Sequence, residues 1–468
     1  MKIAIIGAGI SGCAMYLELQ KHLAKPHGSE SHEIVIYEAY NTGINTTADQ
    51  RKEEATHSST LLVGGGLGIA ANGLRVLERL DDSLLRDVVR GGYAVSSSHL
   101  KSKNGSLLMT MKPNRPTTPD SPPMNMVMSS RDAFWRCLRS RVPDDHIINK
   151  RIEKIVAKQD GRNQIFFVDG SSPEEADLII GADGVRSTAK RAIFPDEEKD
   201  PYPPHYEGLV GVGGFIPASE VKDVVEKGSV NFIFGGNGFF GYFFANSAED
   251  APNRDSPYYV CEPAGSLAWW STYEVEECPD HKNIDTADVT RQLHKRHAEW
   301  KDQAIQKILA SLEVKSMYPT WTSPPIPTWE RDGVILVGDA AHALPPSSGQ
   351  GSSQALEDVE ALALILSHHL EKENKSGDSI SPKGYKRVFK AAAGQYLAIR
   401  QPHVTKILEA ARENQNKKRE MGVFQEYMMY GFLKIMGVFP SLMANKLRLV
   451  VDYNVADHVA ELLATSEC

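Results

Sequence analysis

A Gly-x-Gly-x-x-Gly pattern near the N-terminus has the residue types and spacing that can bind phosphate. The sequence GAGISG places glycines at Gly7, Gly9 and Gly12, with Ile10 and Ser11 between the last two. A short apolar run precedes it and apolar residues at helical spacing follow it, which predicts a strand, a tight turn and a helix. Gly7 would allow the turn, Gly9 would let the backbone approach a pyrophosphate, and Gly12 would let the helix pack on the strand.

The next expected strand, residues 33–39, ends in Glu38, whose carboxylate would accept hydrogen bonds from ribose hydroxyls. A second copy of the pattern, GNGFFG at residues 236–241, lies between two aromatic runs and no helix follows it. It therefore predicts a hairpin turn. Only the first copy predicts a β-α-β dinucleotide site.

Two distant stretches bear on which nucleotide binds. Residues 177–191 read DLIIGADGVRSTAKR, and residues 332–366 hold an aspartate, a histidine, two prolines and Gly-Gln-Gly between an apolar run and a long helical pattern. With GAGISG they resemble, in order and spacing, the three fingerprints of the class A FAD-dependent monooxygenases, the para-hydroxybenzoate hydroxylase-like and salicylate hydroxylase-like family. The resemblance covers most of residues 1–370 and implies FAD as cofactor, with NADPH or NADH as co-substrate.

The resemblance also implies roles for residues of the third stretch. Asp339 would bind the ribityl hydroxyl of FAD, and Pro346, Gly349 and Gly351 would form a turn along the isoalloxazine edge. A flat ring lies against backbone only where side chains are absent, and prolines hold that backbone rigid. Ser352, or the serine after it, is expected to cap the helix whose N-terminus faces the flavin pyrimidine.

Other positions are matched less fully. Asp183 resembles an aspartate that contacts FAD and NAD(P)H, and Arg131 resembles the arginine that reaches the FAD diphosphate. The glycine-rich run that includes Gly65 resembles a family segment ending in Pro-Asn, but here Ala71 precedes Asn72. An arginine found before this run in some relatives is replaced by leucines at positions 61 and 62.

The family chemistry is reduction of FAD by NAD(P)H, addition of O2 to form a flavin C4a-hydroperoxide, and transfer of one oxygen atom to an organic substrate. Water must be excluded, and the aromatic strands could form the roof of such a pocket, with only alternate residues facing it. Eight aromatic residues are candidates: Phe232, Phe234, Phe239, Phe240, Tyr242, Phe244, Trp269 and Trp270.

We expect a fairly large, apolar organic molecule as substrate, aromatic or polyunsaturated, such as a natural-product intermediate. Hydroxylation and epoxidation both stay open, and no residue is assigned as catalytic, because His342 between two alanines more often bonds backbone than moves protons. Two alternatives remain: a flavin-dependent reductase or oxidase of the same fold, and a non-catalytic prenyl-carrier or escort protein.

These observations predict an α/β (α+β) fold: a Rossmann-type FAD-binding domain, an inserted mainly β substrate domain and a C-terminal helical region. The expected FAD-binding domain comprises residues 1–75, 126–190 and 325–368. The substrate domain would comprise residues 76–125 and 191–324, and the helical region residues 369–468. Polar or proline-rich loops are expected at 41–59, 112–125, 194–208 and 322–328.

Composition limits the partners and the compartment. The net charge of −8 and a pI near 6.0 disfavour nucleic acid, because phosphate binding needs clustered Lys and Arg. Five scattered cysteines without a C-x-x-C pair suggest neither a disulfide scaffold nor a metal site, and a reducing, cytoplasmic setting fits. The apolar segment 427–444 is interrupted by glycines and a proline, so a helical hairpin packed on the body is favoured over a membrane contact.

Overall fold

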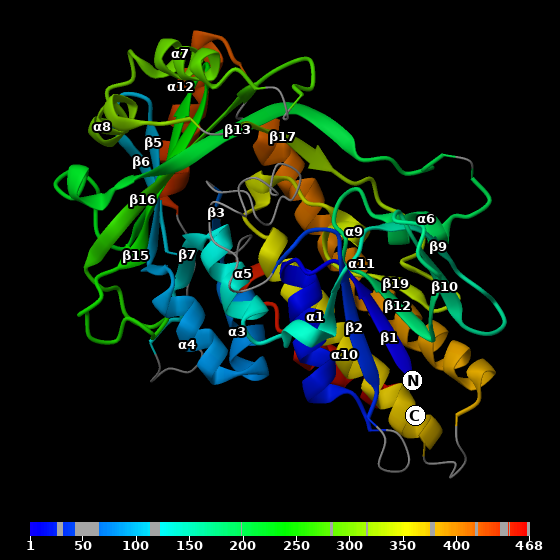
Figure 1. Cartoon of the computed structure of the whole chain (residues 1–468). Coiled ribbons are helices and arrows are strands. Elements are labelled where there is room, and N and C mark those ends of the chain that lie inside the picture. Colours follow the sequence, from blue (N-terminus) through cyan, green and yellow to red (C-terminus); the bar gives the residue numbers. More distant parts are fainter. Residues whose placement is uncertain are drawn as a thin grey trace.

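The computed structural model describes most of the chain. The described residues are 1–25, 31–42, 65–112, 122–197, 199–280, 284–314, 317–374, 380–416, 420–439, 448 and 450–465. Most of the loop expected at 41–59 lies outside these residues, as do the two leucines at 61 and 62, much of the loop expected at 112–125 and the end of the apolar segment 427–444. The elements fall into a nucleotide-binding part, in the lower half of Figure 1, and a second sheet in its upper half.

A six-stranded, mainly parallel sheet forms the centre of the lower part, in the order β18-β19-β12-β1-β2-β8. Its strands are β1 (Lys2–Ile6), β2 (Glu33–Glu38), β8 (Ile147–Asn149), β12 (Leu178–Gly181), β18 (Glu330–Arg331) and β19 (Val334–Leu336). Only β18 runs antiparallel. Continuous apolar runs such as KIAII are buried because helices cover both faces of a parallel sheet.

Helices pack around this sheet and share one apolar core with it. They are α1 (Ile10–His22), α3 (Ala71–Leu80), α4 (Asp82–Arg90), α5 (Arg131–Arg139), α6 (Thr188–Ile193), α9 (Asp339–His342), α10 (Gly351–Asn374), α11 (Pro382–Asn416) and α14 (Val455–Thr465). The boundary expected at residue 76 falls inside α3, whose apolar residues belong to this core together with those of α4. The division into domains stays a proposal.

Two small sheets extend the nucleotide-binding part. One has the order β3-β7-β4, and the other β11-β10-β9. Their bounds are β3 (Gly66–Ile69), β4 (Tyr93–Val95), β7 (Met126–Ser130), β9 (Ile152–Val156), β10 (Asn163–Phe167) and β11 (Glu174–Ala176), and the short helix η2 (Asp144–His146) precedes β8. The sheet containing β3 lies between the nucleotide-binding sheet and the upper sheet (Figure 1).

A seven-stranded sheet forms the upper part, in the order β17-β13-β16-β15-β14-β5-β6. Its strands are β5 (Ser97–Ser102), β6 (Leu107–Met111), β13 (His205–Pro217), β14 (Ser229–Gly235), β15 (Gly238–Ser247), β16 (Pro263–Glu274) and β17 (Met317–Thr322), with η3 (Ala218–Glu220), α7 (Thr286–His297) and α8 (Gln303–Ser311) alongside. Strands β14 and β15 pair antiparallel up to Gly235 and Gly238. The hairpin predicted for GNGFFG is confirmed.

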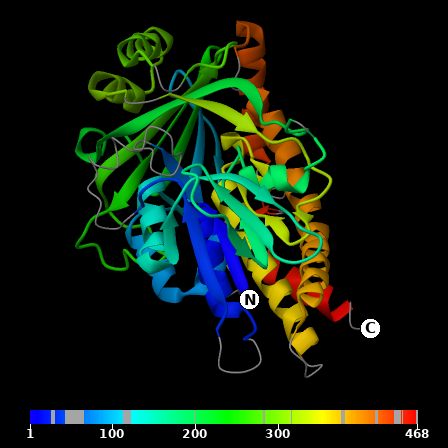
Figure 2. The ribbon, with the colours of Figure 1, turned by 45° about the vertical axis from the view of Figure 1, so that its right-hand side comes forward.

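Residues after 351 are mainly helical, as expected. Helices α10 and α11 lie side by side along the nucleotide-binding sheet, and α12 (Val423–Val438) packs on β6 of the upper sheet (Figure 2). Among the residues that the structure describes, no helix combines the length and apolarity needed to cross a membrane. The mixed α/β fold predicted from the sequence is confirmed.

Candidate functional site

The first glycine motif forms a turn with very little space for side chains. Gly7 has φ +100°, and a Cβ there would lie 2.7 Å from the carbonyl oxygen of Ala182. A Cβ on Gly12 would lie 1.8 Å from the Gly7 carbonyl oxygen. Helix α1 starts after Gly9 without a capping side chain or an acidic residue in its first turn. Its first amide groups therefore leave a partial positive charge where an anion can bind.

Glu38 at the end of β2 holds the same turn in place. One carboxylate oxygen accepts a hydrogen bond from the Ala8 amide at 2.7 Å, and the other accepts one from the Tyr40 amide at 3.0 Å. Trp135 of α5 adds a bond from its indole nitrogen to the Ala8 carbonyl oxygen at 2.8 Å. Burial raises the pKa of the Glu38 carboxyl, although these amides favour its charged form.

Asp183, just after β12, is engaged by helix α6. Its carboxylate accepts bonds from the Ser187 hydroxyl at 2.5 Å, from the Thr188 amide at 2.6 Å and from the Ala189 amide at 3.2 Å. The backbone next to it, at Gly184, has φ +77°, and no atom of the described part of the chain lies within 4 Å of the position that a Cβ would take there. The side chain thus stabilises the start of α6, and open space borders the glycine that follows it.

The turn after β19 lies directly beside the first glycine motif. Gly338 has φ +59°, and a Cβ there would lie 2.4 Å from the Ser11 hydroxyl oxygen of α1. Strands β1 and β19 both run parallel to β12, so their carboxyl ends meet at one edge of the sheet. Residues separated by more than 300 positions are therefore neighbours in a single site.

Asp339 is the first residue of α9 at this edge. Its side chain is exposed, yet surrounding protein displaces enough solvent to raise the pKa of its carboxyl. From an exposed carboxylate that is nevertheless desolvated by surrounding protein, we infer that Asp339 lies in a concave part of the surface, which we call the recess. The charge of Arg131 acts on Asp339 and opposes the shift. The structure thus brings two predicted site residues from α5 and α9 together.

Bare backbone borders the recess on two sides. Among the residues that the structure describes, none has an atom within 4 Å of the position that a Cβ would take on Gly65, Gly349 or Gly351. The Gly65 carbonyl oxygen accepts a bond from the Arg131 amide at 2.9 Å, and Gly349 has φ +60° at the end of the short helix η4 (Pro346–Ser348). Such backbone has the exposure that a flat ring needs, so the residues present fit FAD.

One expectation about this turn is wrong. Neither Ser352 nor Ser353 caps α10, because the helix already begins at Gly351 and both hydroxyls point to β3 and the residue after it. The Ser352 hydroxyl donates to the Gly68 carbonyl oxygen at 3.3 Å, and the Ser353 hydroxyl accepts from the Ala70 amide at 3.2 Å. These two serines join the start of α10 to the β3 segment.

A buried network of ion pairs and hydrogen bonds supports the turn at Gly338, which precedes Asp339. Arg400 of α11 contacts Glu357 at 2.6 Å and Asp358 at 2.9 Å, and all three side chains are fully buried. Glu357 also accepts a hydrogen bond from the side-chain amide of Asn72 at 2.5 Å. Asp358 accepts from the Gly338 amide at 3.0 Å, next to Asp339. The network therefore fixes the backbone that carries Asp339.

His342 belongs to this network. Its ring was expected to bond to backbone, but it contacts a carboxylate instead, so that expectation is wrong. Its Nε2 atom lies 2.5 Å from an Asp358 carboxylate oxygen, while the ring packs beside Trp329. Burial acts to raise the pKa of Asp358, but His342 and Arg400 outweigh it and hold the pKa below its usual value. His342 thus positions the turn through Asp358.

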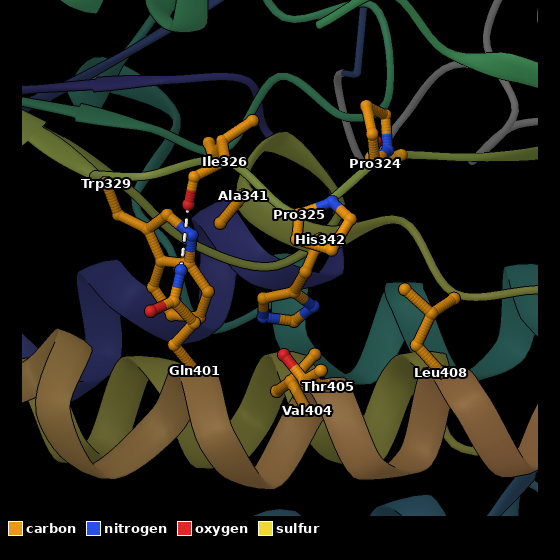
Figure 3. A pocket seen from close by; sticks show the side chains of 11 residues that line it. Pro324, Pro325, Ile326, Trp329, Ala341, His342, Gln401, Val404, Thr405 and Leu408 are labelled. Atoms are coloured by element: carbon orange, nitrogen blue, oxygen red, sulfur yellow. Dashed lines mark hydrogen bonds between the residues drawn. The ribbon is translucent and has the colours of Figure 1, made fainter.

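A narrow pocket lies beside His342, between the segment 323–329 and α11 (Figure 3). Its empty volume of about 290 Å³ includes open solvent. A bond of 2.8 Å from the Gln401 amide to the Ile326 carbonyl oxygen closes one end. None of the predicted site residues lines it, so it is distinct from the recess at Asp339.

The upper sheet divides its aromatic residues between two faces. Phe240 stacks with Trp269 at 5.8 Å between ring centroids and contacts His297 of α7, so this face is packed under the helices. The other face carries Phe232, Phe234, Phe239, Phe243 and Trp270, whose rings contact one another. Phe243 reaches Gly66 of β3. The second set, which we call the aromatic face, therefore lies on the side of the upper sheet that packs on the β3-β7-β4 sheet.

Comparison with known proteins agrees with this geometry. Residues 148–380 match the family model described as FAD binding domain. A chloroplastic zeaxanthin epoxidase of Prunus armeniaca is 23% identical over 405 residues, 85% of this chain and 53% of the relative. A 3-amino-4-hydroxybenzoate 2-monooxygenase of Streptomyces cremeus is 25% identical over 370 residues, 78% of each protein. The chain thus spans about half the length of the zeaxanthin epoxidases that it matches.

Solved structures share the fold along almost the whole chain. HpxO of Klebsiella pneumoniae, complexed with FAD and uric acid, has a TM-score of 0.68 at 18% identity and covers 96% of this chain and 97% of its own. A salicylate hydroxylase substrate complex has a TM-score of 0.68 at 17% identity and covers 99% and 98%. The chain therefore shares the fold of these solved proteins. Its resemblance to the class A FAD-dependent monooxygenases, inferred from three motifs, is confirmed.

Several residues of the site were not predicted from the sequence. Trp135, Glu357, Asp358 and Arg400 all act through partners far along the chain. A signal was present for two of them, because two consecutive acids inside the apolar pattern of α10 have to be paired if they are buried. Nothing in the sequence identified Arg400 as their partner.

Proposed function

We propose that the chain is an FAD-dependent monooxygenase that uses NADPH or NADH and O2 to insert one oxygen atom into an apolar aromatic or polyunsaturated molecule. The observation that carries the proposal is the recess itself, where bare backbone at Gly65, Gly349 and Gly351 surrounds an exposed carboxylate, Asp339. The family match and the shared fold support it.

The residues that would hold FAD come from four segments. The turn from Gly7 to Gly12 would bind the pyrophosphate with the N-terminus of α1, and Glu38 would meet the ribose. Arg131 would add a cation to the diphosphate. Asp339 would bind the ribityl chain, with Pro346, Gly349 and Gly351 along the ring.

When bound, FAD supplies the redox chemistry that accepts electrons from NAD(P)H and activates O2. The chain would orient the ring through the turn held by Arg400 and Asp358. The start of α10, which has no acidic residue in its first turn, would stabilise negative charge there. The aromatic face would exclude water and bind the substrate. Its five rings carry no acid or base, so the face favours chemistry that needs no protein base.

Two alternatives make different predictions. A reductase or oxidase of the same fold would consume NAD(P)H or desaturate the substrate without adding oxygen to it. An escort protein would bind no flavin. Against the escort protein stand the intact glycine turn, Glu38 and the recess at Asp339, which such a protein would have no reason to keep.

The test is anaerobic reduction of the purified protein by NADPH and by NADH, with a panel of aromatic and polyunsaturated compounds. We expect a yellow protein whose flavin bleaches faster when one class of compounds is present. Asp339→Ala should lose FAD on purification, whereas Asp250→Ala, an exposed carboxylate on a distant loop, should retain it. A colourless wild-type protein that FAD cannot restore would contradict the proposal.

A further inference from the structure

Helix α12 presents a large apolar surface to solvent. Phe424, Tyr427, Met428, Phe432, Ile435 and Val438 are each between 52% and 78% exposed. Single exposed apolar residues are common on proteins, but a group of this size on one short helix marks an interaction surface. We call these six residues the outer face of α12.

The inner side of the helix is firmly attached to the upper sheet. The Tyr430 hydroxyl donates to the Phe234 carbonyl oxygen at 2.6 Å, and Leu433 is buried among residues of β5 and β6. Lys103 contacts Glu426 at 2.8 Å. The outer face is therefore a fixed feature of the folded chain, with its apolar side chains turned away from contacts that already stabilise the helix.

The charges on α12 are distributed unevenly. Its acidic residue, Glu426, is buried against Lys103, while Lys434 is exposed among the apolar side chains. Within the described residues of α12 no acidic side chain is exposed, although the whole chain has a net charge of −8. An apolar surface with a cation and no anion complements a layer of acyl chains under anionic phosphates.

A second copy of the chain fits this surface poorly. A symmetric contact would place the same outer face on both sides and would bury two copies of Lys434. Since the outer face offers no carboxylate, neither ammonium group would have a partner, and an unpaired buried charge is costly. At a bilayer, a lysine stem lies along the apolar layer while its ammonium group reaches the phosphates.

We propose that the outer face of α12 docks on the surface of a lipid bilayer, with the helix lying parallel to it. The inner side of α12 packs on Phe232 and Phe234 of the aromatic face. Figure 1 places α12 beside β5 and β6, the edge of the upper sheet next to the strand that carries these rings. Docking would therefore bring the aromatic face close to the lipid phase, where apolar molecules are concentrated.

Flotation of the full-length protein with vesicles tests the proposal and needs no turnover. The vesicles are phosphatidylcholine alone, or phosphatidylcholine mixed with phosphatidylserine. We expect the wild type to float with the mixed vesicles. The triple variant Phe424→Gln, Phe432→Gln and Ile435→Gln should partition about 1000-fold less, because each of the three lost apolar side chains contributes about tenfold. Lys434→Glu should weaken binding to the mixed vesicles more than to the neutral ones.

The control is the double variant Val168→Gln and Tyr259→Gln, which removes two apolar side chains that are equally exposed elsewhere and should float like the wild type. Circular dichroism and light scattering establish that every variant is folded and report its oligomeric state. A wild type that stays in the aqueous fraction overturns the proposal, as does a triple variant that floats equally well. A wild-type dimer that the triple variant converts to a monomer, without vesicle binding, also overturns it.

Discussion

Gly351 and Gly394 are two helical glycines with open space where a Cβ would lie, but only Gly351 borders the recess at Asp339. Gly351→Ala should fold normally and weaken FAD binding by at least about tenfold, because a methyl group would occupy space that the ring needs. Gly394→Ala on α11 should leave FAD affinity unchanged and stabilise the protein by about 1 kcal/mol. Titration of the apoprotein with FAD, followed by flavin fluorescence, measures both. Wild-type affinity in Gly351→Ala would mean that the ring lies elsewhere.

Glu18 of α1 is expected to make the stability of the protein depend on pH. Within the described structure neither of its carboxylate oxygens accepts a hydrogen bond, and burial together with nearby Glu360 raises its pKa from 4.5 to about 8. The unfolded chain releases this proton at a lower pH than the folded chain does. Glu18 therefore lowers the stability progressively as pH rises from 4.5 to about 8.

Glu18→Gln removes this titration. The unfolding free energy of the variant should exceed that of the wild type by an amount that grows with pH through this window, at a limiting slope of about 1.4 kcal/mol per pH unit. Urea unfolding at several pH values measures the difference. A difference that stays constant would show that the Glu18 carboxyl titrates normally in the fold.

The elements that form the site act through partners on other elements. Arg400 of α11 contacts two acids of α10, and one of these holds the turn before α9. Arg400→Met should lower the unfolding free energy by about 3–5 kcal/mol, because it leaves Glu357 and Asp358 buried without their cation. FAD affinity should fall as well, since Asp339 would lose its support.

Two further variants make this prediction specific. Arg400→Lys should recover little, because an ammonium group cannot form the forked contacts of a guanidinium. Arg412→Met, on an exposed part of the same helix, should change neither property. Urea unfolding and FAD titration measure the effects. Equal stability of Arg400→Met and the wild type would refute a supporting role for the network.

For the elements, the sequence predicted the local structure but did not predict which distant residues contact one another. Apolar runs and glycines predicted β1, its turn, α1 and the hairpin at residues 236–241, because each depends on neighbours within a few residues. The bond from Asn72 to Glu357 joins residues 285 positions apart. No local pattern encodes such a pair. The capping role expected for Ser352 failed for the same reason, since its partner lies in β3.

At the scale of the whole molecule, the recess lies where three structural parts meet. The carboxyl ends of the parallel strands form one side and the start of α10 another, and the aromatic face of the upper sheet contacts β3, which follows Gly65. Alternation along β14 to β16 predicted that only half of the aromatic residues could face a pocket. Which half could be known only from the packing of α7 and α8 on the other side.

Under the proposed function, the substrate would gain one oxygen atom from O2 while the aromatic face shelters it from water. The most direct measurement is the mass of the product formed under isotopically heavy dioxygen, with NADPH or NADH and the compound that most accelerates flavin bleaching. We predict a product heavier than its substrate by one labelled oxygen atom. A product that carries oxygen from water, or no added oxygen while NAD(P)H is consumed, would contradict a monooxygenase.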